Sequence, residues 1–131
     1  MTILLIDRDM RFRASIAAML RAEGCIVQEY TQVSDLPPLD TLEEFSLVIT
    51  DHTANDQNGL AFTDAFHKAQ PSTPILLLTA YWSLHLAGEV GRREFAQLRR
   101  KPIKYAELDS LVRYLGTQGI SSRVQSTAGH L

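Results

Sequence analysis

The sequence predicts an α/β fold in which helices cover both faces of a parallel β-sheet. Five short apolar segments alternate along the chain with segments whose apolar residues follow helical spacing, and this alternation implies right-handed crossovers. Two of these segments, 3–6 and 46–50, are apolar runs that stop at a carboxylate, which is typical of strands buried on both faces. With 131 residues, the chain has the length of one domain with a single core.

The first strand, 3–6, leads into a predicted helix. Asp9 is a suitable N-cap and Gly24 a suitable end for this helix, and four apolar residues recur between them at helical spacing: Phe12, Ile16, Met19 and Leu20. Residues 25–30 follow as a second strand, and their partly polar composition favours an edge of the sheet.

Residues 31–45 connect the second strand to the third, which covers 46–50. The pair Pro37-Pro38 breaks any long helix in this connection. We therefore expect a loop with one short helix over about 39–45.

The middle of the chain repeats the alternation of helix and strand. Gly59 lets the backbone turn into a helix, which apolar spacing places over about 62–69 and which Pro71 closes. The fourth strand covers 75–78, and a weaker helix follows over about 82–90.

The last part of the chain contains the fifth strand, 96–100, and the clearest helix. Its apolar stripe predicts an end at Gly116 and consists of Leu108, Leu111, Val112 and Leu115. Residues 117–131 lack apolar periodicity, so we interpret 1–116 as the folded domain and 117–131 as a flexible tail or linker stub.

Composition and charge restrict the class of protein. The net charge of −2 gives no reason to expect nucleic-acid or membrane binding by this domain. A single cysteine excludes an internal disulfide and fits a reducing compartment. No segment reaches the roughly 18 apolar residues of a membrane span, and the N-terminus leads straight into a strand without a signal peptide. We therefore expect a cytoplasmic protein.

Four chemically matched side chains stand where predicted strands end. Asp7 and Asp51 supply carboxylates, Thr79 a hydroxyl and Lys101 a cation. Ligands of open parallel sheets bind at the carboxyl ends of the strands, so these groups are expected at one edge. Together they form a site suited to phosphoryl transfer onto a carboxylate.

These motifs make the chain similar to the receiver domains of two-component response regulators over about residues 1–116. The resemblance rests on four segments in the right order: Ile-Leu-Leu-Ile-Asp7, Leu-Val-Ile-Thr-Asp51 followed by Gly59, Ile-Leu-Leu-Leu-Thr79-Ala80, and Lys101-Pro102. It implies a flavodoxin-like, doubly wound (βα)5 fold with a five-stranded parallel sheet of order 2-1-3-4-5. It also implies a cis bond between Lys101 and Pro102.

The resemblance implies a role for each site residue. Asp51 would accept a phosphoryl group from a histidine kinase, a phosphotransfer protein or a small acyl phosphate. Thr79 would hydrogen-bond the phosphoryl oxygens and Lys101 would pair with them. The Mg²⁺ ligands would be the side chains of Asp7 and Asp51 and the backbone carbonyl of Thr53, with Asp9 as a further candidate. The domain would be no enzyme beyond its own phosphotransfer and dephosphorylation, and it would switch a surface for a downstream protein or output domain. A homodimer is compatible with this reading.

Several positions depart from the family pattern, among them Ala54-Asn55, Glu94-Phe95 and two that affect the site and the switch. Arg8 replaces the usual second acidic residue, so the charges around the site cancel: Asp7, Asp51, Arg8 and Lys101. We therefore expect weakened Mg²⁺ binding, with Arg8 directed either to solvent or into the metal's place beside Asp51. Leu98 stands where the family has an aromatic switch residue, and we hypothesise that Tyr81 or Trp82 takes over that role.

Two alternatives remain open. The first is a receiver-like interaction module that works without phosphorylation, because Arg8 and Lys101 neutralise the carboxylates permanently. The second is a phosphatase of the haloacid-dehalogenase-like class, suggested by the Asp-x-Asp spacing of Asp7 and Asp9 and by the pair Asp51 and Asp56. That class, however, places its late metal-binding carboxylates after the hydroxyl and the lysine, and here Asp51 precedes both.

Overall fold

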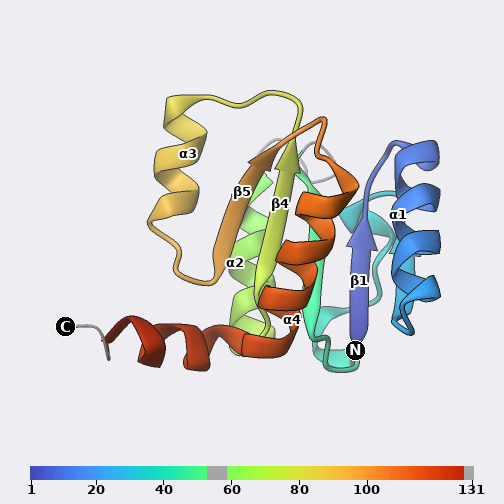
Figure 1. Cartoon of the computed structure of the whole chain (residues 1–131). Helices are drawn as coiled ribbons and strands as arrows, with labels where there is room; N and C mark the ends of the chain where they lie inside the picture. Colours follow the sequence, from blue (N-terminus) through green and yellow to red (C-terminus); the bar gives the residue numbers. More distant parts are fainter. Residues whose placement is uncertain (53–58, 129–131) are drawn as a thin grey trace.

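A five-stranded parallel sheet forms the centre of the molecule. The computed structural model describes residues 1–52 and 59–128 (Figure 1). The strand order is β2-β1-β3-β4-β5, so the predicted flavodoxin-like order is confirmed. The strands are β1 (Thr2–Ile6), β2 (Ile26–Tyr30), β3 (Leu47–Asp51), β4 (Ile75–Thr79) and β5 (Ala96–Arg100).

Four α-helices accompany the sheet in the described residues: α1 (Met10–Ala22), α2 (Gly59–Ala69), α3 (Leu84–Gly91) and α4 (Tyr105–Ala128). The predicted cap of α1 is confirmed, because the Asp9 side chain accepts a hydrogen bond from the Phe12 backbone N–H. Gly24 follows this helix with a φ of 92°, a left-handed conformation that glycine adopts at little cost.

The β2–β3 connection differs from the prediction of one short helix over 39–45. It contains two single 3₁₀ turns, η1 (Val33–Asp35) and η2 (Leu39–Thr41), on either side of Pro37-Pro38. Each proline lacks an N–H donor, so a longer hydrogen-bonded helix cannot form across this pair.

The prediction that the last helix ends at Gly116 was wrong, because α4 continues to Ala128. The apolar stripe stops near Leu115, but a single glycine costs only about 1 kcal/mol relative to alanine and does not end a helix by itself. Figure 1 shows the terminal part of α4 extending away from the sheet. That residues 117–131 form a tail or linker stub stays a prediction.

Alternating strand residues build a core on each face of the sheet. Ile3 and Leu5 face α1 and α4, whereas Leu4 and Ile6 face α2 and α3. All four side chains are completely buried. The rigid sheet fixes the position of every residue that follows a strand, and the candidate site is built from such residues.

Candidate functional site at the carboxyl edge of the sheet

Asp7, Asp51 and Lys101 meet at the carboxyl edge of the sheet. Asp7 directly follows β1 and Asp51 is the last residue of the adjacent strand β3. Both carboxylates are buried, with 1% and 6% of their surface exposed. The Nζ atom of Lys101 lies 2.8 Å from Oδ2 of Asp7 and 3.5 Å from Oδ2 of Asp51. One cation therefore serves two buried carboxylates.

The negative charge of the site is only partly compensated. Burial raises the pKa of Asp7 above its ordinary value, and the nearby Asp51 charge acts in the same direction. The hydrogen bonds from Lys101 and from the Asp9 backbone N–H, 2.8 Å from Oδ1, oppose this rise. Lys101 also lies over the Phe12 ring, with Nζ 4.6 Å from its centroid. The two buried carboxylates thus share the positive charge of Lys101.

Thr79 ends β4, the neighbour of β3 and β5 in the sheet. The strand register pairs Leu78 with Asp51, so Thr79 lies one residue beyond Asp51 at the same edge. Its side chain is fully buried, and its Oγ1 accepts a hydrogen bond from the Tyr81 backbone N–H at 3.0 Å. The hydroxyl proton can therefore be donated to an oxygen ligand.

Lys101 is positioned by the end of β5. Its backbone N–H donates a 2.7 Å hydrogen bond to the Thr79 carbonyl, which ties the two neighbouring strand ends together. The peptide bond between Lys101 and Pro102 is cis, so this expectation is confirmed.

Arg8 and Asp9 lie at the exposed rim of the site. Within residues 1–52 and 59–128, the Arg8 side chain forms no hydrogen bond and no ion pair, with Asp51 or any other residue. Asp9 is exposed as well, and one of its carboxylate oxygens is used for the cap of α1. The Arg8 side chain is therefore directed to solvent and not into the metal's place.

The donor atoms at this edge fit a hard divalent cation, although with few protein ligands. Mg²⁺ typically binds through one or two carboxylates and keeps several waters, and Asp7 and Asp51 supply two. The part of the chain that the structure describes contains no group of three or more histidine, cysteine, aspartate or glutamate side chains that could hold a metal. Thr53, whose backbone carbonyl was predicted as a ligand, lies outside the described residues.

An aromatic loop lies beside the site, between β4 and α3. Tyr81 is 76% exposed. The guanidinium of Arg100 lies over the Trp82 ring in a cation–π contact, with Cζ 4.3 Å from the ring centroid. Leu98, by contrast, packs against the buried cluster under α2 and α3. Sequence reasoning missed the contact of Arg100 with Trp82. No signal in the sequence marks this contact, because it depends on the register that places Arg100 opposite Thr79.

Sheet order, buried carboxylates and a lysine at the carboxyl edge are together typical of one class of α/β signalling domain. The chain matches the family described as response regulator receiver domain over residues 3–113, and it belongs to this family. Receiver domains are parts of two-component response regulators and are signalling domains, generally not classical enzymes. This assignment removes the basis for the phosphatase alternative.

Solved structures of receiver domains resemble the chain closely. A CheY-like receiver domain from Methanospirillum hungatei is 24% identical with a TM-score of 0.76, covering 87% of this chain and 92% of that one. A response regulator from Burkholderia pseudomallei, with a phosphorylated aspartic acid, a calcium ion and citrate, is 26% identical with a TM-score of 0.73. That match covers 97% of this chain and 72% of the other.

The BeF3-activated receiver domain of DrrB is 19% identical with a TM-score of 0.76, and the match covers 87% of this chain and 95% of that one. No curated protein matches the chain. None of the helices within residues 1–52 and 59–128 has the length and hydropathy required to cross a membrane.

Proposed function

We propose that this receiver domain is phosphorylated on Asp51 by a histidine kinase or phosphotransfer protein and that phosphorylation changes a surface read by a partner. The proposal rests mainly on the position of Lys101, whose Nζ atom lies 3.5 Å from Oδ2 of Asp51 and 2.8 Å from Oδ2 of Asp7. Such a cation compensates the charge of the nucleophile and of the incoming phosphoryl group.

The chemistry follows from these side chains. An oxygen of Asp51 forms a bond to phosphorus while the bond from phosphorus to the donor nitrogen or oxygen breaks, so the carboxylate becomes an acyl phosphate. Lys101 pairs with the phosphoryl oxygens, and the buried hydroxyl of Thr79 donates a hydrogen bond to one of them. The Burkholderia pseudomallei regulator, which contains a phosphorylated aspartic acid, supports the same modification here.

Receiver domains generally bind Mg²⁺ in their acidic pocket. In this chain Asp7 and Asp51 would hold the ion, together with the Thr53 carbonyl. Asp9 would have to give up its capping hydrogen bond from the Phe12 backbone N–H to take part. When bound, the ion supplies positive charge at the transferred phosphoryl group. Because Arg8 replaces one acidic residue, we propose that the affinity for Mg²⁺ is lower than with a third carboxylate.

Thr79 connects the site to a surface. Its Oγ1 accepts from the Tyr81 backbone, so a new bond between Thr79 and a phosphoryl oxygen pulls on the loop that carries Tyr81 and Trp82. We propose that this loop, with Arg100 on the Trp82 ring, replaces the aromatic switch missing at Leu98.

Partners follow from the same reasoning. Receiver domains interact with histidine kinases and output domains. The chain matches 52% of the DrrB regulator of Thermotoga maritima and 28% of NtrX from Brucella abortus, so in both proteins the receiver is one part of a longer chain. We propose a kinase or phosphotransfer protein upstream and an output domain or separate protein downstream.

Phosphorylation of the purified chain by acetyl phosphate with Mg²⁺, followed by intact-mass spectrometry, tests the proposal. We expect one added phosphoryl group that is lost with hydroxylamine, is absent from Asp51→Asn and is retained in Asp64→Asn, which changes an exposed carboxylate elsewhere. The phosphorylation-independent module is the second candidate, favoured by the Lys101 bridge that already offsets part of the charge. Absence of modification in the wild-type chain, with donor and Mg²⁺ in excess, would support that candidate instead.

A further inference from the structure

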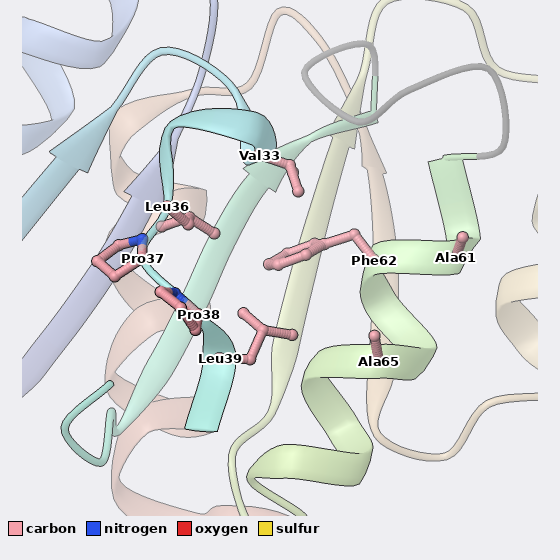
Figure 2. A pocket seen from close by; sticks show the side chains of 8 residues that line it. All are labelled: Val33, Leu36, Pro37, Pro38, Leu39, Ala61, Phe62 and Ala65. Atoms are coloured by element: carbon pink, nitrogen blue, oxygen red, sulfur yellow. The ribbon is translucent and has the colours of Figure 1, made fainter. Parts of the chain in front are cut away.

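An apolar groove lies between the β2–β3 connection and α2, and its lining includes no residue of the strand-end site. Its volume is about 330 Å³. Figure 2 shows its two walls facing each other: Val33, Leu36 and Leu39 on the connection, and Ala61, Phe62 and Ala65 on the helix.

The groove exists because the β2–β3 connection does not pack tightly against α2. The 3₁₀ turns on either side of Pro37-Pro38 are too short to cover α2 as a full helix would. Phe62 is buried and its ring points from α2 towards the connection (Figure 2), whereas Ala61 and Ala65 are exposed and too small to fill the space. Several apolar side chains therefore border solvent along one continuous hollow.

Both walls of the groove belong to a segment of the sequence that is rich in acidic residues. Residues 22–67, which include both walls, contain nine aspartates and glutamates and no lysine or arginine. Two of these acids, Asp35 and Asp40, are exposed and directly adjoin the wall residues Leu36 and Leu39 in sequence. An occupant of the groove therefore needs apolar side chains against the lining residues and positive charge near Asp35 and Asp40.

We propose that this groove binds a basic, apolar peptide segment of a partner protein. Recognition would place apolar side chains of the segment against Phe62 and Leu39, and lysine or arginine near Asp35 and Asp40. The proposal does not depend on phosphorylation of Asp51, because none of the lining residues belongs to the strand-end site.

A second copy of this chain is a less suitable occupant through those of its arginines that are already engaged. Arg93 pairs with Asp64 and Glu89, and Arg113 pairs with Glu23 and Asp109. Arg100 lies on the Trp82 ring. Docking a second copy through these three arginines would require their present contacts to be exchanged.

A labelled helical peptide of leucine and lysine, with leucine at positions i, i+3, i+4 and i+7, provides the probe. Binding is measured by fluorescence anisotropy with the full chain in about 0.15 M salt. At this ionic strength exposed charges are screened beyond about 8 Å, so attraction by charge alone contributes little. Ala65→Arg fills and charges the groove at an exposed helical position. Ala18→Arg makes the same change on the exposed face of α1 and serves as the matched control.

We expect saturable binding that weakens at least tenfold in Ala65→Arg and is unchanged in Ala18→Arg. A peptide with glutamate in place of lysine should bind at least tenfold more weakly, and amide chemical shifts should change mainly over 33–40 and 60–66. Equal binding by both arginine variants, or shift changes centred elsewhere, would overturn the proposal. So would concentration-dependent self-association that Ala65→Arg abolishes, because the occupant would then be a second copy.

Discussion

Individual side chains at the carboxyl edge show how the site balances charge. Lys101 contacts both Asp7 and Asp51, yet burial still raises the pKa of Asp7. Two buried carboxylates share this one lysine, and the exposed Arg8 contributes no ion pair within the described residues.

Arg8→Asp should strengthen Mg²⁺ binding by about tenfold, because it restores an acidic residue beside Asp7 and removes a nearby positive charge. Isothermal titration calorimetry with MgCl₂ measures the dissociation constant. Arg11→Asp, an exposed position on α1 with the same change of charge, is the control and should have a small effect. An equal gain in both variants would mean that only the overall charge matters.

At the scale of elements, the β4–α3 loop is the part of the fold best placed to report on the site. Its backbone is bonded to the hydroxyl of Thr79, and its Trp82 ring lies against Arg100 at the end of β5. A change at Thr79 therefore acts on a contact between two neighbouring strand ends.

Beryllium fluoride with Mg²⁺, a phosphoryl analogue, should change the emission of Trp82, the only tryptophan. The expected reason is a shift of the ring relative to the Arg100 guanidinium. Asp51→Asn should show no change, and Arg100→Gln should alter the emission before any addition, whereas Arg99→Gln should not. Unchanged emission in the wild-type chain, with analogue binding shown by calorimetry, would exclude Trp82 as the reporter.

The whole molecule is held together partly by contacts between its acidic and basic segments. Arg93, which follows α3, donates hydrogen bonds of 2.7 and 2.9 Å to both carboxylate oxygens of Asp64 on α2. This hydrogen bonding lowers the pKa of Asp64 below its ordinary value of 3.8. The ionised carboxylate therefore stabilises the folded state above about pH 3.8, and the contribution is lost as the pH falls through the lowered pKa.

Asp64→Asn should lower the free energy of unfolding by about 0.5 kcal/mol at pH 7, a small value because the Asp64 side chain is 51% exposed. Urea denaturation between pH 7 and pH 3 should show the difference from wild type shrinking at the acidic end. Asp40→Asn, at an exposed position without an ion pair among the described residues, should show no such pH dependence. A difference that persists unchanged at pH 3 would contradict the assigned cause.

Much of the fold was predictable because buried parallel strands leave a clear pattern. The runs ending at Asp7, Asp51 and Thr79 identified three strand ends, and their closeness follows from a parallel sheet. The continuation of α4 past Gly116 was not predictable, since no apolar stripe marks it. The direction of Arg8 and the contact of Arg100 with Trp82 depend on side-chain packing between elements, which neither periodicity nor composition reveals.

The cation-free stretch 22–67 has a consequence for how the domain meets other molecules. It includes the edge strand β2, whereas the opposite edge strand β5 ends in Arg99 and Arg100. A net charge of only −2 therefore conceals an uneven distribution of charged residues along the sequence. Rates of encounter with a charged molecule should therefore depend on ionic strength more than the small net charge alone suggests.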